Sequence, residues 1–533
     1  MSRFLKKEFN IKEANAARAF ALFASILIAL SLILLVARGS FPTPFSDEFY
    51  FFRIYSDAKS GNFRLNEILS PHFGHIYILL KSWLWLVVHY DIDWRASMYI
   101  QVIFIALTVS FILKYILNIE SKNKKLPAIL SIAFALGSAR QAENLYWAIQ
   151  ISAATMLFSS IVAFYFVARH SETQRNKFSV LAFVFSLLAL LSNGGGIATF
   201  LLTACAIFAT SKKIYIKIIC ALTGALFAAG ILAYMLPSKG ASLGASLISI
   251  KNIFIYFLAF FSNSLFSFSQ RGDDIYSLLT GAAVSALTIY TLTSSWRQKD
   301  RNIFPYLLIL FSVASCILIS YARLKGGIWQ PNASRYYPFA AIILVGNALI
   351  LSNANNKVQQ YSAVILFALI SISFSQAYFM EWKISPYRYI YSKNAHFSLC
   401  SGNNKGLAFH GDLQYTDTTT LKDIFCTQQD IRLAEIKSLP VLKEIGPTQT
   451  NRNTPFNVQP DGGSALWART ENCENSCVIV FSDREIPAVA NQDGALLTAQ
   501  IPIELFESPG EKTVYIKKIT SDKQSRTLTF KVH

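Results

Sequence analysis

Long apolar segments separated by short polar loops recur along the first 380 residues of the chain. A helix needs about 20 mainly apolar residues to cross the hydrocarbon core of a membrane. The first such segment covers residues 18–37, and we expect it to be retained as the first membrane span. The pattern predicts ten more spans, at 96–118, 126–140, 148–168, 178–192, 196–211, 213–235, 275–295, 303–321, 337–353 and 361–380.

Basic loops between these segments predict the orientation of the spans, because cytoplasmic loops are enriched in Lys and Arg. Basic residues from Arg3 to Arg18 precede the first span, which places the N-terminus in the cytoplasm. The odd number of spans then places the C-terminal residues on the outer side. The same arrangement keeps four further basic clusters inside, at 122–125, 169–177, 212–217 and 297–301.

Two apolar stretches, 74–90 and 250–268, are left over. If both crossed the membrane, the number of spans would still be odd, but the basic clusters between them would face outward. We therefore expect both stretches to lie along the outer membrane surface as interfacial helices.

The pattern changes after residue 380. Gly, Asn, Asp, Thr and Pro become frequent, and short runs alternate apolar and polar residues, which is typical of strands. We expect a transmembrane domain over 1–380, a mixed extracytoplasmic segment over 381–454 and a small β-sandwich over 455–533. The predicted fold is a polytopic α-helical membrane protein with about eleven spans and a C-terminal extracytoplasmic β-rich domain.

The composition supports a membrane protein bound to a lipid bilayer. Charged residues make up 15% of the 533 residues, against about 25% in an average soluble protein, and hydrophobic residues make up 53%. A soluble enzyme and a disordered protein are therefore excluded. The net charge of +18 lies entirely on residues 1–380, which favours a topological role for the basic residues and argues against a nucleic-acid partner.

Four of the seven cysteines, Cys400, Cys426, Cys473 and Cys477, lie in the C-terminal part. An even number there suits an oxidising compartment. Four cysteines allow three pairings, of which we expect Cys400 with Cys426 and Cys473 with Cys477. A redox-active pair or a metal site is the alternative.

Polar residues gather in loops on the predicted outer face. Asp47 and Glu48 follow the first span, where a carboxylate can accept a proton from a hydroxyl or hold a divalent ion. A solvated loop is the simpler interpretation of the pair. His72 and His75 follow in the same loop and could hold a metal with the acids or bind a lipid phosphate.

A second polar segment interrupts apolar sequence between two predicted spans. Polar side chains at such a place are costly unless they pair or bind a ligand. An ion pair between Arg140 and Glu143 is one interpretation, and ligand binding is the other. The segment also contains Gln141, Asn144 and Trp147.

A third segment carries Arg323, Trp329, Arg335 and Tyr336 on a predicted outer loop, against the usual preference of basic residues for the inside. Arginine forks suit phosphate oxygens, so a lipid phosphate is the expected ligand, with ordinary anionic phospholipid as the alternative. Carboxylates, arginines and aromatics on one face suit transfer of a sugar from a lipid phosphate to a hydroxyl.

These segments resemble the GT-C class of polyprenyl-phosphate-sugar-dependent glycosyltransferases, and within it the bacterial serotype-converting O-antigen glucosyltransferases. The resemblance covers about residues 20–380. Relatives tend to carry Asn-Glu-His-Arg where this chain has Phe73-Gly-His-Ile76, so the acid and the Arg of that motif are missing. The matching segments are 47–48, 70–75, 141–150, 323 and 334–336.

The resemblance implies an inverting transfer of a sugar, glucosyl by analogy, from polyprenyl phosphate to a cell-surface glycan such as O-antigen, on the periplasmic side of the bacterial inner membrane. Asp47 or Glu48 would be the base. Some members of the class use a divalent metal, and a flippase and a donor synthase would be partners. Arg140, Arg323, Arg335 and Tyr336 would bind the donor phosphate, while His72, His75, Gln141, Glu143, Asn144, Trp147 and Trp329 would bind substrate.

Other functions predict different sequence features. A transporter or flippase of lipid-linked sugars would place charges near the bilayer midplane and show internal repeats, and the chain has neither. An O-antigen polymerase or ligase would place a large loop between spans instead of a terminal β-domain. In a structural or receptor protein, Asp47, Glu48 and the arginines would be replaceable.

Overall fold

A computed structural model describes residues 2–44, 46–70, 72, 77–118, 125–235, 250–266, 274–296, 302–323, 330–352, 356–400, 418–427, 439–459, 463–473, 477–491, 495–518 and 523–533. The chain forms two compact units, Met1–Ser392 and Lys393–His533. The boundary between them falls within one long helix, which continues from the predicted span at 361–380 as far as Cys400.

Each segment predicted as a membrane span corresponds to a helix in the first unit. Within the described ranges, six segments are long and apolar enough to cross a membrane: Ala21–Gly39, Arg95–Leu117, Ala148–Thr173, Ile275–Ser295, Ser334–Ser352 and Lys357–Ile390. The helices are α1 (Ser2–Gly39), α5 (Arg95–Asn118), α6 (Lys125–Leu136), α8 (Ile151–Thr173), α9 (Asn176–Ser192), α10 (Gly196–Thr210), α11 (Ile214–Met235), α13 (Ile275–Trp296), α14 (Phe304–Arg323), α15 (Tyr337–Ser352) and α16 (Lys357–Cys400).

The helices of this unit differ in what they bury. Every residue of α15 is buried, so this helix forms the centre of the unit, in contact with α6, α13 and α14. By contrast, α1 and α16 expose large apolar side chains, such as Leu22 at 62% and Ile365 at 60%. An exposed apolar face of this kind is expected where lipid, rather than water, surrounds a helix.

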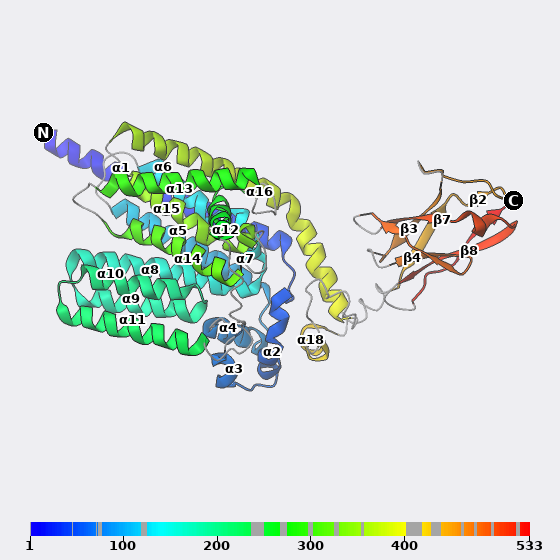
Figure 1. The fold of residues 1–533 in the computed structure, drawn as a ribbon, viewed down its shortest axis with the longest axis horizontal. Coiled ribbons are helices and arrows are strands. Elements are labelled where there is room, and N and C mark those ends of the chain that lie inside the picture. The colour runs from blue at the N-terminus through cyan, green and yellow to red at the C-terminus, as the bar shows by residue number, and fades with distance from the viewer. Residues whose placement is uncertain are drawn as a thin grey trace. The chain divides into compact units, whose positions relative to one another are not determined.

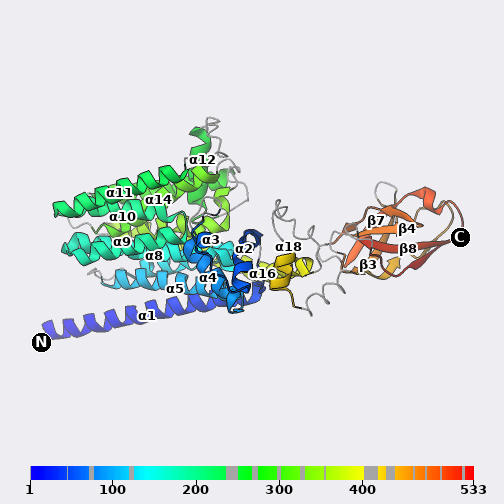
Figure 2. The ribbon, with the colours of Figure 1, turned by 90° about the horizontal axis from the view of Figure 1, so that it is seen from below.

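One apolar helix, α12 (Ile250–Ser262), lies across the others, which run side by side (Figures 1 and 2). Its backbone packs directly against α13: a Cβ atom added at Gly281 of α13 would clash with the backbone of Leu258 in α12. This crossing direction fits the interfacial helix expected at 250–268. The other leftover stretch contains α4 (Ile78–His89), a helix of 12 residues that packs against α2 (Phe52–Lys59).

Short helices gather at one end of the first unit, together with α2 and α4 (Figure 1). We call this the polar end, and it comprises the elements between α1 and α5, between α6 and α8, and between α14 and α15. Within it, η1 contacts η3 and α7 contacts η6. The short elements are η1 (Ser46–Phe51), α3 (Leu65–Leu69), η2 (Ala139–Gln141), α7 (Ala142–Tyr146), η3 (Ala148–Gln150), η5 (Gln330–Asn332) and η6 (Ser334–Tyr336).

The second unit contains α18 (Thr418–Phe425) and two β-sheets, in the strand orders β1-β3-β7-β6 and β2-β9-β8-β4-β5. The two sheets share one apolar core, to which Leu466, Leu497, Ile479 and Phe530 belong. All the pairs are antiparallel except β2 with β9. The strands are β1 (Val441–Gly446), β2 (Gln449–Thr450), β3 (Ser464–Glu471), β4 (Cys477–Phe481), β5 (Arg484–Ile486), β6 (Val489–Ala490), β7 (Leu496–Ile501), β8 (Gly510–Lys518) and β9 (Leu528–Val532).

The β-structure begins earlier in the chain than the predicted 455–533. β1 pairs with β3 from Val441↔Glu471 to Gly446↔Trp467, with an irregularity between Leu442 and Glu444. Residues 441–450 therefore belong to the sheets and not to the mixed segment. This irregularity interrupts the alternation of apolar and polar residues in β1, so the sequence pattern does not predict the strand.

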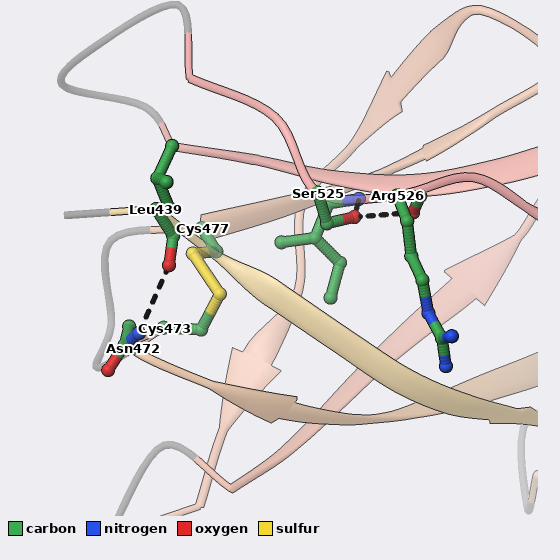
Figure 3. Close-up of a disulfide and its surroundings, with 7 residues drawn as sticks. Leu439, Asn472, Cys473, Cys477, Ser525 and Arg526 are labelled. Carbon is green, nitrogen blue, oxygen red and sulfur yellow. Dashed lines mark hydrogen bonds between the residues drawn. A yellow bond between two sulfur atoms is a disulfide. The ribbon is translucent and has the colours of Figure 1, made fainter. Parts of the chain in front are cut away.

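The two predicted disulfides are confirmed. Cys400, at the end of α16, is bonded to Cys426, just after α18. Cys473 and Cys477 join the end of β3 to the start of β4 (Figure 3). Beside the second disulfide, the Asn472 side chain donates to the Leu439 carbonyl at 3.1 Å. These disulfides fit an extracytoplasmic domain.

Candidate functional site

Glu48 fixes the loop after α1 to the start of α8. Its carboxylate is buried and accepts two hydrogen bonds, from Trp94 Nε1 at 3.1 Å and from the backbone N–H of Ile149 at 2.9 Å. Ile149 lies in η3, directly before α8, where free N–H groups and the helix dipole favour a negative charge. Both carboxylate oxygens are engaged, so Glu48 serves as a structural anchor.

Asp47 precedes this anchor in η1. The structure describes its backbone, while its side chain is outside the described part. The loop is further fixed by the buried Tyr55 hydroxyl, which donates to the Glu48 carbonyl at 2.8 Å, and burial raises the pKa of Tyr55 well above its ordinary value. Because the Glu48 carboxylate is committed to Trp94 and Ile149, Asp47 is the better candidate for a base.

Two of the predicted segments meet at the polar end. The Glu143 carboxylate accepts from the Arg335 backbone N–H at 2.9 Å and from the Arg335 guanidinium at 3.3 Å. In return, the Glu143 N–H donates to Ser334 Oγ at 3.0 Å, and the Asn144 side chain donates to the Arg335 carbonyl at 3.2 Å. The side chains of Arg335 and Glu143 remain 22% and 26% exposed, so a ligand can reach them.

Arg140 lies in η2. Among the described residues, no carboxylate forms an ion pair with it. Its guanidinium donates to Asn263 Oδ1 at 3.0 Å and to the Leu265 carbonyl at 3.5 Å, and lies 5.7 Å from the centre of the Tyr337 ring. Its Nε is buried and has no hydrogen-bond partner among the residues that the structure describes. The expected alternative, an ion pair of Arg140 with Glu143, is not formed, because Glu143 pairs with Arg335.

Burial lowers the pKa of Arg140 to about 10, so the side chain keeps its charge near neutral pH. A buried charge that has lost water and gained only neutral partners is unfavourable. Such a group is stabilised by an anion, which makes Arg140 a candidate for anion binding.

Asn263, directly after α12, ties Arg140 to the loop that carries Arg335. Its amide donates to the Pro331 carbonyl at 3.0 Å and to the Ala333 carbonyl at 3.2 Å, while its oxygen accepts from Arg140. The two arginines are therefore held by one hydrogen-bonded network at the polar end.

Arg323 is the last residue of α14 and is exposed. Burial raises the pKa of the Tyr256 hydroxyl on α12, and the positive charges of Arg323 and Arg335 both oppose this rise. Tyr336 is buried, and the Arg335 guanidinium lies 5.1 Å from the centre of its ring. The structure thus brings the predicted phosphate-binding residues to one end of the unit.

The predicted substrate-binding histidine is part of an aromatic cluster. The His72 ring stacks on Phe51, with centroids 4.2 Å apart, and lies 6.3 Å from Tyr77. His75 and Trp329 fall outside the described residues. Nearby, the buried Lys81 ammonium donates to the Glu67 carbonyl at 2.7 Å and the Ser70 carbonyl at 2.6 Å, which closes this loop, and burial lowers the pKa of Lys81.

Gln141 and Trp147 take part in bonds that shape the backbone. The Gln141 side chain is buried and donates to the Leu136 carbonyl at 2.7 Å, which satisfies an open carbonyl at the end of α6. The Trp147 carbonyl accepts from Gln101 Nε2 at 2.6 Å. Neither bond involves a ligand, so these residues position the segment that carries Arg140 and Glu143.

Sequence reasoning missed an ion pair on α16. Arg388 binds both oxygens of Glu381, at 2.6 and 3.1 Å, and lies 5.4 Å from the centre of the Tyr146 ring in α7. The available signal was the return of charged residues directly after the apolar run that ends at residue 380. Asn263 gave no signal, because one Asn in an apolar stretch does not indicate a partner.

Among the described residues, no three His, Cys, Asp or Glu side chains lie close enough to hold a metal ion. Comparison of the chain with protein-family models, with curated proteins and with solved structures finds no match.

Proposed function

We propose that this chain is a membrane glycosyltransferase of the GT-C type. It transfers a sugar from polyprenyl phosphate to a hydroxyl of a cell-surface glycan such as O-antigen. The observation that carries this proposal is the pair of arginines at the polar end: Arg140 with only neutral partners among the described residues, and Arg335 held by Glu143. Two cations beside an acidic loop suit a reaction in which a phosphate leaves and a hydroxyl loses a proton.

The proposed reaction is a single displacement at the anomeric carbon of the donor. Asp47 takes the proton of the acceptor hydroxyl, whose oxygen attacks the anomeric carbon of the donor. The bond from that carbon to the phosphate oxygen breaks, and its electron pair stays on the polyprenyl phosphate, which gains a negative charge. Attack opposite the leaving group inverts the anomeric centre, by the geometry of inverting glycosidases.

Arg140, Arg335 and Arg323 stabilise the charge that develops on the leaving phosphate. Fixed charges in a dry site stabilise a transition state more than water does, because they need no reorganisation. Glu48 holds η1 against η3 and so positions Asp47. Glu143 positions Arg335 in the same way.

The proposed reaction requires a membrane topology. In this topology all eleven predicted segments cross the bilayer, the N-terminus is cytoplasmic, and the polar end faces the periplasm of the bacterial inner membrane. α4 and α12 lie along the outer surface. The C-terminal unit with its two disulfides is then periplasmic, where disulfides persist.

A cellular assay tests the proposal. Cells that make lipid-linked sugar and O-antigen express the wild type, Asp47→Asn or Asp91→Asn, and the mass of the O-antigen is measured. We expect a hexose-sized increment with the wild type and its loss with Asp47→Asn at equal protein level. Asp91→Asn is the matched control, since Asp91 forms an exposed pair with Lys59 at 3.1 Å.

An unchanged increment with Asp47→Asn would remove Asp47 as the base and leave the transfer standing. The absence of an increment in every strain, with donor lipid present, would contradict transfer to this glycan and favour a flippase or polymerase.

A further inference from the structure

Tyr256 is a fully buried tyrosine whose hydroxyl has no hydrogen-bond partner in the part of the chain that the structure describes. It lies on α12, the helix that crosses the others at the polar end (Figure 2). A buried hydroxyl that makes no hydrogen bond has lost water without compensation. A phenylalanine would fill the same space without this cost, so the hydroxyl is a candidate for contact with a ligand where its surroundings favour one.

The surroundings of Tyr256 indicate the charge of that ligand. α12 packs against α14, which ends at Arg323, and against η5, which precedes Arg335. Burial raises the pKa of the Tyr256 hydroxyl, and both arginines oppose this rise, so both guanidinium groups lie within electrostatic range of it. The other groups that act on it, Tyr336 and Cys316, are neutral at neutral pH. The hydroxyl therefore faces positive charge, where an anion is favoured.

We propose that the Tyr256 hydroxyl donates a hydrogen bond to a phosphate oxygen of the lipid-linked donor, between Arg323 and Arg335. This inference rests on the proposed function and adds a positioning residue to it. The arginines attract the phosphate by charge, whereas the neutral hydroxyl orients it through one hydrogen bond. An O–H donor to an anionic oxygen forms a short and strong hydrogen bond. In the proposed topology α12 lies along the outer membrane surface, which puts this hydrogen-bond donor at the depth of a lipid phosphate.

Binding of farnesyl phosphate to the full-length protein in detergent micelles tests the inference, with farnesol and inorganic phosphate as parallel probes. Tyr256→Phe removes the hydroxyl and keeps the ring. We expect the affinity for farnesyl phosphate to fall about tenfold, the size of one lost hydrogen bond to a charged group. Affinity for farnesol and the melting temperature without ligand should stay unchanged, since no bond within the protein is lost.

Tyr115→Phe is the matched control. Tyr115 is also a buried tyrosine whose hydroxyl has no hydrogen-bond partner among the described residues, but it lies in the last turn of α5, at the opposite end of that helix from Trp94. The same loss of a hydroxyl should leave the affinity for farnesyl phosphate unchanged.

Wild-type affinity of Tyr256→Phe for farnesyl phosphate would overturn the inference and leave the proposed function intact. Equal binding of farnesyl phosphate and farnesol by the wild type would contradict both. If inorganic phosphate bound as tightly as farnesyl phosphate and showed the same loss, the ligand would be free phosphate, which would overturn the lipid-linked assignment.

Discussion

The two units of this protein use charged residues in opposite ways. In the β-unit, ion pairs such as Arg469–Glu444 and Lys517–Glu485 lie on the surface, and Arg469 and Glu444 are 66% and 48% exposed. In the helical unit, Glu48 is fully buried between two donors, and Arg140 is desolvated among neutral partners. Exposed pairs contribute little to stability, whereas buried charges are costly and tend to mark function.

This difference favours the helical unit as the place of the proposed reaction. In the described part of the β-unit, the ion-paired charges lie at the surface, where water can solvate them, so they call for no ligand. The buried charges of the helical unit, such as Glu48 and Arg140, lie at the polar end, where Arg140 has only neutral partners among the described residues. Under the proposed function, the reacting groups belong to the polar end, and the second unit serves the first.

Glu48→Ala should give the largest effect on stability. The substitution leaves the Trp94 and Ile149 N–H groups buried without an acceptor, and we expect the free energy of unfolding to fall by about 3 kcal/mol, from two hydrogen bonds to a charged group. Thermal unfolding followed by tryptophan fluorescence measures the change.

Glu444→Ala on β1 is the matched control for this comparison. It removes the same side chain from an exposed pair, and we expect a change of at most about 0.5 kcal/mol. Equal effects of the two substitutions would contradict the difference between the units.

Glu143→Gln should have a smaller effect. The glutamine oxygen can still accept from the Arg335 backbone N–H, but the ion pair is lost, so we expect a destabilisation of about 1 kcal/mol. Affinity for farnesyl phosphate should rise severalfold, because a negative charge next to the proposed phosphate site is gone. Weaker binding with an unchanged melting temperature would mean that Glu143 itself contacts the ligand.

Local patterns predicted much of the fold. Runs of apolar residues gave the helices, and the even number of C-terminal cysteines indicated the oxidised pairs. The sequence did not reveal where α6 ends. The predicted span ran to residue 140, whereas the helix stops at Leu136, and Gln141 folds back onto its last carbonyl. The hydrogen-bonding side chain lies beyond the apolar run, so periodicity does not report it.

Long-range partners were the part that the sequence could not provide. Glu143 and Arg335 were both candidates, but their pairing depends on packing between segments 192 residues apart. Tyr256 was hidden because a tyrosine in an apolar stretch is read as part of the interfacial surface. The predicted roles of all the candidate site residues stay predictions, and for His75 and Trp329 the structure describes no position.

The most direct test of the central claim is the shift in melting temperature that farnesyl phosphate produces in the wild type and in Arg140→Gln. If the Arg140 charge is balanced only by a bound anion, Arg140→Gln should change the stability of the ligand-free protein little. The substitution removes two hydrogen bonds, which lowers stability, and also removes the unfavourable burial of a charge, which raises it. We predict that farnesyl phosphate raises the melting temperature of the wild type and leaves that of Arg140→Gln unchanged. A large destabilisation of Arg140→Gln together with an undiminished ligand shift would contradict the account and make Arg140 a structural residue.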